Sequence, residues 1–264
     1  MSAWKEFEKE WAKFLMDTYG DLAYFQHMGE EDSTVPDILV KTNTGKTFYI
    51  EAKKCPAQCG QFVLLPDDKT RTFIYSDKND TPINEFAKTI MRFMNRYYND
   101  FKNAGTAGKT IVFDNMEEVF TNWIINTYGN KGVELFGTND HVMFPLNDFH
   151  KYFNVTGTYR IKRSGSSKVG NSNMKGVIDY IQSNFGLNTY RKTDGGSLFY
   201  VTNKNMHNRR FDVGAYEYMF SYRDNEFEIR KLSNTYNANV IFSITLKYDA
   251  PSGMTKQEII KFLK

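Results

Sequence analysis

Two carboxylates and a lysine have the spacing expected of a metal-dependent reaction on a phosphate. Asp37 follows Pro36, and Glu51 stands two residues before Lys53. Two carboxylates that converge can bind Mg²⁺ together with a phosphate and water molecules. The metal lowers the pKa of an attacking water and polarises the phosphoryl group. Lys53 can orient or deprotonate that water, or offset the charge that builds on phosphorus.

A hairpin of two strands must bring these side chains together. Residues 36–41 and 47–53 read as strands, and a polar, glycine-containing segment separates them. Alternation along the second strand places Glu51 and Lys53 on one face, where they can line a cleft. The first strand begins at Asp37, so a hairpin can bring its carboxylate beside Glu51.

The motif has an ordinary alternative. Given average residue usage, a pattern this short arises by chance in roughly one chain in ten to twenty. A surface strand with a solvated Glu/Lys pair would carry the same residues. Placement on a hairpin, behind an amphipathic helix, favours the catalytic interpretation.

A third carboxylate lies on the first predicted helix, residues 4–19. Glu8 falls inside the apolar stripe of this helix, where an uncompensated charge is costly. It can be a metal ligand or a neighbour of one, and a partly exposed rim position is the alternative. The stripe consists of Trp4, Phe7, Trp11, Phe14 and Leu15.

Four more helices and a β-rich second half complete the predicted organisation. Helical spacing of apolar residues predicts helices at 84–101, 115–128 and 174–185, and Thr255 with Glu258 forms a capping box before a terminal helix. A Gly/Ser-rich stretch is expected to form a mobile loop at 164–173. Strands are expected at TYRIKR (158–163), SLFYVT (197–202), YEYMFSYR (216–223), FEIRKL (227–232) and NVIFSITLK (239–247).

Charge is distributed unevenly along the 264 residues. Residues 1–150 hold 16 Lys/Arg and 22 Asp/Glu, and residues 151–264 hold 18 Lys/Arg and 9 Asp/Glu. The halves therefore carry −6 and +9, although the whole chain carries only +3. An acidic half beside a basic half suits an enzyme that binds cations with one part and a polyanion with the other, and a chance asymmetry is the alternative.

The remaining composition excludes several classes of protein. Cys55 and Cys59 do not have zinc-ribbon spacing and no second Cys/His pair completes a site, so we expect reduced thiols and no structural zinc. No apolar run approaches the roughly 20 residues of a membrane span, and the N-terminal segment is charged where a signal peptide is apolar. We expect a cytoplasmic protein.

These motifs resemble the PD-(D/E)xK nuclease superfamily, and more closely a type II restriction endonuclease within it. The resemblance covers most of the chain and is weakest over about 167–228. It is carried by WKEFE (4–8), TYG (18–20), DST (32–34), Asp37-Ile38-Leu39, FYIEAK (48–53), QCGQFVL (58–64), YFNV (152–155), TYRIK (158–162), SGS (164–166) and NANVIFSI (237–244).

The resemblance implies an α/β restriction-endonuclease-like core, a mixed sheet flanked by helices, with a β-rich basic DNA-recognition extension. It implies a single nuclease domain over 1–264, with the catalytic core at about 1–150 and the DNA-recognition half at about 151–264. It also implies Mg²⁺, double-stranded DNA cut at a short GC-rich palindrome, GCGC in that relative, and a companion DNA methyltransferase in a prokaryotic cell. A monomer and a homodimer both stay open.

By motif position, the resemblance assigns catalysis to Asp37, Glu51 and Lys53, with Asp37 and Glu51 binding the metal. Glu8 takes the helix-carboxylate position that many members use. Gln61 matches a glutamine placed beside the scissile phosphate, and a polar residue at the start of a helix is the alternative for it.

Two segments can supply contacts to DNA. Arg and Lys side chains pair with guanine edges, whereas Ser, Thr and Asn side chains suit phosphates and cytosine edges. Arg209 and Arg210 form a third group that suits phosphate. The candidates in the first two segments are Arg160, Lys162, Arg163, Ser164 and Ser166, and then Asn234, Tyr236, Asn237 and Asn239.

Two other functions fit the same residues. A non-catalytic DNA-binding module would use the basic half alone, but it gains little from carboxylates clustered near phosphates. A repair or resolvase nuclease on the same core would cut by DNA structure and not by base sequence. Digestion of one plasmid with Mg²⁺ separates the three by discrete fragments, no cutting or junction-dependent cutting.

Overall fold

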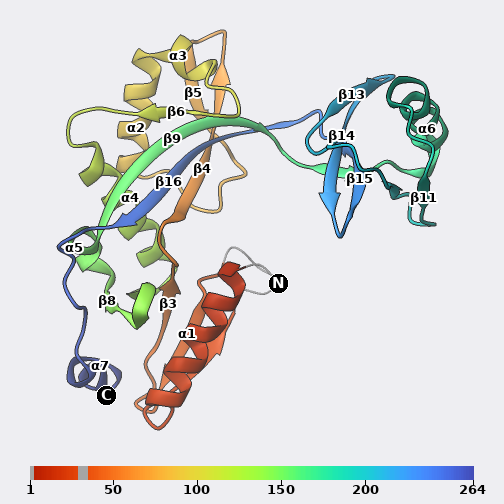
Figure 1. Ribbon diagram of the computed structural model, residues 1–264. Helices are drawn as coiled ribbons and strands as arrows, with labels where there is room; N and C mark the ends of the chain where they lie inside the picture. The colour runs from red at the N-terminus through yellow and green to blue at the C-terminus, as the bar shows by residue number, and fades with distance from the viewer. Residues whose placement is uncertain (1–2, 29–34) are drawn as a thin grey trace. The chain divides into compact units, whose positions relative to one another are not determined.

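The computed structural model describes residues 3–28 and 35–264, and the DST segment at 32–34 lies outside them. Two compact units are formed: unit 1 comprises Met1–Arg160 and Ala238–Lys264, and unit 2 comprises Ile161–Asn237. Strands β9 (Phe153–Arg163) and β16 (Tyr236–Leu246) carry the chain from unit 1 into unit 2 and back (Figure 1). The chain thus passes between the units near residues 160 and 238, and the division into a catalytic core and a DNA-recognition half near residue 150 stays a prediction.

The first sheet of unit 1 is mixed and contains the predicted hairpin. Strands β2 and β3 pair antiparallel, with Ile38 opposite Ile50, while β3 and β7 run parallel. This register places the residue before β2 opposite Glu51. The strand order is β1 (Ala23–His27), β2 (Ile38–Thr42), β3 (Thr47–Ala52), β7 (Val133–Gly137) and β8 (Met143–Pro145).

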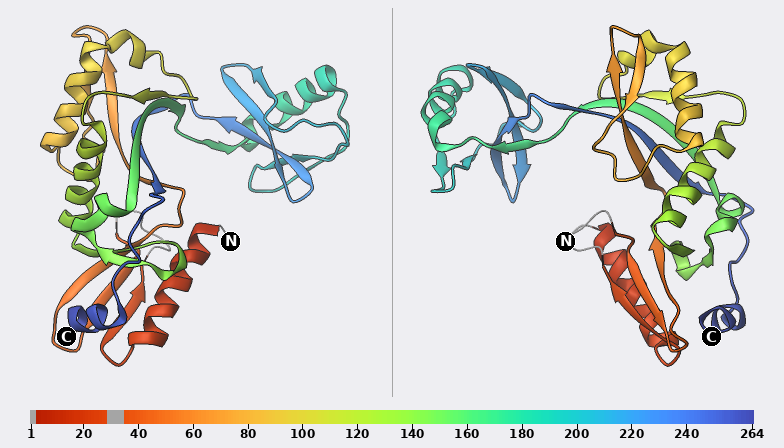
Figure 2. Two further views of the ribbon diagram at one scale, coloured as in Figure 1. Left: turned by 60° about the vertical axis from the view of Figure 1, so that its left-hand side comes forward. Right: turned by 180° about the vertical axis from the view of Figure 1, so that it is seen from behind.

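Two helices bury the apolar side chains of this sheet. Helix α1 (Ala3–Tyr19) confirms the predicted amphipathic helix, and its Trp11 and Leu15 are fully buried against the strands. The terminal helix α7 (Lys256–Leu263) begins at the predicted capping box and adds Leu263 to the same core. Helix α1 lies along the hairpin in both views of Figure 2.

The second sheet of unit 1 has the order β5 (Thr72–Tyr75), β4 (Ala57–Asp67), β16, β9 and β6 (Lys109–Ile111). Helix α4 (Met116–Asn130) packs on it through Phe120 and Trp123, whose rings contact Phe242. The short helices α5 (Phe149–Tyr152), η1 (Asn139–His141) and η2 (Leu146–Asp148) complete the unit. Strands β4 and β5 were not predicted.

The predicted helix at 84–101 is interrupted. Helix α2 (Glu85–Arg96) ends at Tyr97, whose N–H bonds the carbonyl of Met94, and α3 (Tyr98–Lys102) follows. The apolar spacing continues through this break because Phe93 contacts both Tyr97 and Phe101. Side-chain periodicity therefore did not reveal the interruption.

Unit 2 is an antiparallel sheet covered on one face by helix α6 (Asn171–Phe185). The expected loop at 164–173 is wrong in part, because it contains β10 (Ser166–Lys168), which pairs with β15, and the start of α6. The sheet order is β11 (Tyr190–Lys192), β12 (Leu198–Tyr200), β15 (Glu226–Leu232), β14 (Tyr216–Arg223) and β13 (Arg210–Val213).

No helix within residues 3–28 and 35–264 is long and apolar enough to cross a membrane.

Close packing of Trp11 on Gly137 leads to a stability prediction. A Cβ at Gly137 would lie 2.8 Å from the fully buried indole of Trp11. Gly137→Ala should therefore lower the free energy of unfolding by about 1–3 kcal/mol, because a packed ring must move. Urea denaturation followed by circular dichroism measures the change.

Gly129→Ala is the matched control. Its Cβ would meet only Leu146, at 3.8 Å, inside helix α4, so stability should be unchanged or slightly higher. Equal unfolding midpoints for the two variants would contradict the close packing of Trp11 on β7.

Candidate active site

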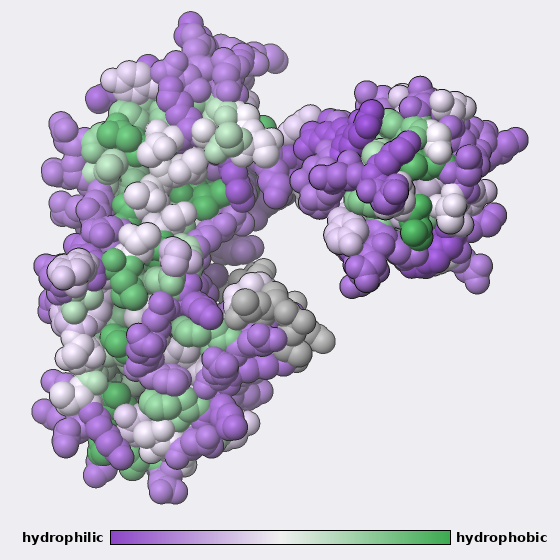
Figure 3. Space-filling view, in the orientation of Figure 1, coloured by the Kyte–Doolittle hydropathy of each residue, from purple (hydrophilic) through white to green (hydrophobic). Residues whose placement is uncertain are grey.

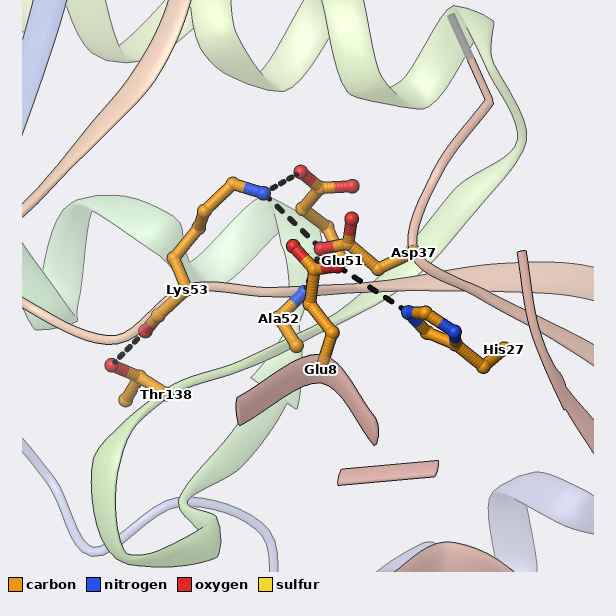
Figure 4. Close-up of polar contacts among 7 residues, drawn as sticks. All are labelled: Glu8, His27, Asp37, Glu51, Ala52, Lys53 and Thr138. Carbon is orange, nitrogen blue, oxygen red and sulfur yellow. Dashed lines mark hydrogen bonds and ion pairs between the residues drawn. The ribbon is translucent and has the colours of Figure 1, made fainter. Parts of the chain in front are cut away.

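Asp37, Glu51 and Lys53 converge at the end of the hairpin, as predicted (Figure 4). The Nζ of Lys53 lies 3.1 Å from Asp37 Oδ2 and 2.5 Å from Glu51 Oε1. The backbone N–H of Ala52 donates to Asp37 Oδ2 at 2.9 Å. Two carboxylates from neighbouring strands thus share one ammonium group.

Helix α1 adds a third carboxyl group to this cluster. Glu8 is only 4% exposed, which excludes the exposed-rim alternative. Its Oε2 lies 3.3 Å from His27 Nε2, and its carboxyl group is close enough to Asp37 for the charge of that residue to raise its pKa. Two neighbouring carboxyl groups in a buried site favour the neutral form of one of them.

Burial sets the ionisation of the cluster. Desolvation, reinforced by the charge of Asp37, raises the pKa of Glu8 to about 8. Desolvation also raises the pKa of Glu51 to about 6, although Lys53 opposes this shift. Burial alone would lower the pKa of Lys53, but the charges of Glu51 and Asp37 outweigh it and hold that pKa above its usual value. Lys53 is therefore a cation here.

A second layer of side chains supports the cluster from β7 and α4. Thr138 Oγ1 donates to the carbonyl of Lys53 at 3.0 Å, and the N–H of Lys53 donates to the carbonyl of Gly137 at 2.9 Å. Buried Tyr128 lies beside Glu51 and partly offsets the rise in the pKa of its carboxyl group. Cys59 is fully buried beside them, and burial raises the pKa of its thiol.

Sequence reasoning identified neither Tyr128 nor His27 as part of the site. Tyr128 reaches it from helix α4, which is distant in the chain, and His27 reaches it from β1, the strand before the hairpin. Their residue types form no motif with Asp37 or Glu51. A buried tyrosine with a polar partner at a predicted carboxylate is visible only once the sheet is assembled.

The cluster opens into a cavity of about 790 Å³ in unit 1. Gln58, and not Gln61, is on its wall. Gln61 lies on strand β4, so the helix-start alternative is wrong, and its Oε1 accepts bonds from Gln58 Nε2 and Asn239 Nδ2, both at 3.2 Å. The main polar and aromatic lining residues are Trp4, Glu8, Asp37, Glu51, Lys53, Lys54, Gln58, Tyr128 and Lys131.

The donor set fits a hard divalent cation. Asp37 and Glu51 already converge on one positive charge, and oxygen ligands are those that Mg²⁺ prefers. Among the residues that the structure describes, no three His, Cys, Asp or Glu side chains form a complete metal cage. Two carboxylates would leave the other coordination positions to water and substrate oxygens.

The first predicted DNA-binding segment straddles the two units. Arg160 is half-buried in unit 1, whereas Lys162 and Ser164 are exposed in unit 2. Arg163 is held by ion pairing with Glu217 and donates to the carbonyl of Ser233 at 2.9 Å. This guanidinium therefore has a structural role that the basic motif did not reveal.

The second segment is divided in the same way. Asn234, Tyr236 and Asn237 are exposed in unit 2, but Asn239 is buried in unit 1, where it bonds Gln61. Ser164, Ser166 and Asn234 line a shallow cavity of about 430 Å³ in unit 2, together with Tyr216 and Lys231.

Arg209 and Arg210, the third group, lie on opposite faces of unit 2. The guanidinium of Arg209 is 4.6 Å from the ring centroid of Phe185 in α6, whereas Arg210 lies 3.7 Å from Glu217. Strand alternation separates them, so they cannot act as a pair.

The mixed α/β fold and this site define a restriction endonuclease-like protein. No family model and no curated protein sequence matches the chain. A solved structure of the HhaI endonuclease in complex with DNA matches it with a TM-score of 0.77 and 37% sequence identity. The match covers 99% of this chain and 98% of the other. The chain belongs to the family of the HhaI restriction endonuclease.

The raised pKa of Glu8 makes stability depend on pH. Protonated Glu8 stabilises the fold fully below its unfolded pKa, and this contribution is lost as the pH rises toward 8. Without divalent metal, the free energy of unfolding should fall by a few kcal/mol between about pH 5 and pH 8. Glu8→Gln, which cannot ionise, should flatten this profile in urea denaturation.

Glu10→Gln is the control, since Glu10 is an exposed carboxylate on the same helix and its loss should keep the wild-type profile. Superimposable pH profiles for wild type and Glu8→Gln would disprove the raised pKa of Glu8.

Proposed function

We propose that the chain is a Mg²⁺-dependent type II restriction endonuclease that hydrolyses phosphodiester bonds in double-stranded DNA. The observation that carries this proposal is the sharing of the Lys53 ammonium by Asp37 and Glu51 at the wall of a large cavity. Membership of the HhaI family supports it, because that relative was solved with DNA. The arrangement supports the assignment of a PD-(D/E)xK site.

Asp37 and Glu51 would hold the metal, and Glu8 would complete the acidic side of its site. Bound Mg²⁺ supplies Lewis-acid polarisation of the phosphate and a more acidic water. Lys53, kept protonated by its neighbours, would donate to the attacked phosphate or the water and offset developing negative charge.

Two glutamines can orient the substrate at the cavity. Gln58 stands on the wall and would donate to a phosphate oxygen through its amide. Gln61 would act one step behind it, because its carbonyl oxygen accepts the Gln58 amide. Asn239 bonds the same oxygen and so fixes the Gln61 side chain from β16.

Unit 2 is proposed as the DNA-recognition extension. It contains 12 Lys/Arg and 7 Asp/Glu, a net charge of +5. Phosphate contacts by such a surface supply most sequence-independent affinity for DNA. A GC-only target such as GCGC rewards arginine and lysine donors, which suit guanine O6 and N7.

The biological setting follows from the same proposal. A nuclease that cuts GCGC needs a companion DNA methyltransferase that protects the same site in a prokaryotic cytoplasm. No stable complex between the two enzymes is required. The palindrome can be cut by a homodimer or by a monomer that nicks each strand in turn.

Removing either metal-binding carboxylate should abolish cleavage without abolishing binding. Asp37→Asn and Glu51→Gln should lower the cleavage rate by about 10²- to 10⁴-fold, because the metal contributes several kcal/mol to the barrier. Plasmid cleavage in Mg²⁺ measures the rate, and fluorescence anisotropy in Ca²⁺ measures binding. Glu10→Gln serves as the control, and wild-type rates in either site variant, or in EDTA, would refute the assignment.

Cleavage ends should map to GCGC. Digestion of a fully sequenced plasmid, followed by sequencing of the fragment ends, should place every end at that palindrome. Ends at another palindrome would support the nuclease activity but refute GCGC as its target sequence. Ends spread at random, or confined to DNA junctions, would instead favour a repair nuclease.

A further inference from the structure

One face of the unit 2 sheet is covered by α6, and the opposite face carries charge. Leu198, Tyr200, Phe211, Tyr218 and Phe220 point into the core that includes α6. Because side chains alternate along each strand, their neighbours in sequence lie on the other face. There Arg230 stands opposite Met219, which in turn stands opposite Arg210.

Five arginines gather on this second face, and we call it the arginine face. Four come from the sheet strands and one from the end of β9: Arg163, Arg191, Arg210, Arg223 and Arg230. Lys168 shares the face because it pairs with Arg230, and Asp212, Glu217, Glu226 and Glu228 provide its acidic groups. In Figure 3 the visible face of unit 2 is mostly hydrophilic, with some hydrophobic residues near its centre.

Glu217 and Glu228 each hold two guanidinium groups. Glu217 pairs with Arg163 and lies 3.7 Å from Arg210. Glu228 lies 2.7 Å from Arg230 and 3.4 Å from Arg223.

Two arginines are fixed further. Arg230 donates to the carbonyl of Ser166 at 2.9 Å. Arg191 is held by Glu226 through a bond of 2.9 Å and stacks on Phe199 at 3.9 Å.

Glu217 and Glu228 lie beneath three of the guanidinium groups. The side chains of Glu228 and Glu217 are 6% and 19% exposed, those of Arg230 and Arg163 are 16% and 23% exposed, and those of Arg191, Arg210 and Arg223 are 53–57% exposed. A ligand that approaches Arg191, Arg210 and Arg223 therefore meets these cations before the two carboxylates. Carboxylates below fix the planar forks, which reduces the entropy lost when these groups bind a phosphate or a guanine edge.

We propose that the arginine face is the surface with which unit 2 contacts the DNA duplex, and that Glu217 and Glu228 position its guanidinium groups for this contact. The proposal rests on the proposed DNA-cutting function and specifies its recognition surface. Fixed arginine forks match phosphates and the O6/N7 edge of guanine, and the major groove is wide enough for a β-ribbon.

Binding of the full chain to a GCGC duplex and to a duplex without that site, in Ca²⁺ over a range of salt, tests the face. Arg191→Gln with Arg223→Gln should weaken binding to both duplexes roughly tenfold or more. It should also reduce the salt slope by about 0.9 for each phosphate that the protein no longer neutralises. Lys175→Gln with Lys204→Gln removes the same charge from the α6 side and should bind like wild type.

The positioning role of Glu228 predicts a change in DNA affinity opposite to the one that net charge predicts. Net charge alone predicts tighter DNA binding when a carboxylate is lost, and exposed Asp179→Asn on α6 should show that small effect. Glu228→Gln should instead weaken binding, because Arg223 and Arg230 lose the group that orients them. Thermal unfolding of each variant establishes that the fold is retained.

Two outcomes would overturn the proposal: affinity retained in the Arg191/Arg223 variant while the α6-side variant weakens, or tighter binding by Glu228→Gln. Cleavage by wild type in Mg²⁺ is measured separately. If the protein binds duplexes through the arginine face but never cuts them, the proposed nuclease activity is refuted and the proposed DNA-binding surface is retained.

Discussion

One ammonium group shared between two buried carboxylates governs the site. Asp37, Glu51 and Glu8 are all largely withdrawn from solvent, and Lys53 donates to two of them. Burial and the charge of Asp37 raise the pKa of Glu8, which favours a proton on this group when no metal is bound. A bound cation would therefore lower the electrostatic free energy of this site.

The surrounding elements follow from the need to keep that group of charges in place. The hairpin register sets Asp37 beside Glu51, and parallel pairing with β7 fixes the backbone of Lys53. Trp11 of α1 packs directly on Gly137, so the helix that brings Glu8 is anchored to the strand that holds Lys53. The contacts that pack the core therefore also position the charged groups of the site.

What could be predicted from sequence was local. Asp37, Glu51 and Lys53 belong to one hairpin, and the stripe of α1 is a property of one helix. The family resemblance placed Gln61 beside the phosphate, but on strand β4 it is Gln58 that lines the cavity. Strands β9 and β16 have the same β-branched and aromatic composition as the strands of unit 2, yet most of their length belongs to unit 1. Composition therefore did not show where the compact units divide. Which face of YEYMFSYR and FEIRKL meets α6 depends on packing, so the arginines of the other face were overlooked.

The insertion of unit 2 between β9 and β16 has a consequence for the order of folding. These strands are neighbours in one sheet, but the whole of unit 2 separates them in the chain. Pairing them across an unstructured segment would carry the loop-closure entropy of its full length. Unit 2 has its own apolar core, and its early collapse would bring the two ends together before the sheet closes. The order of assembly would then run from the inserted unit to the central sheet.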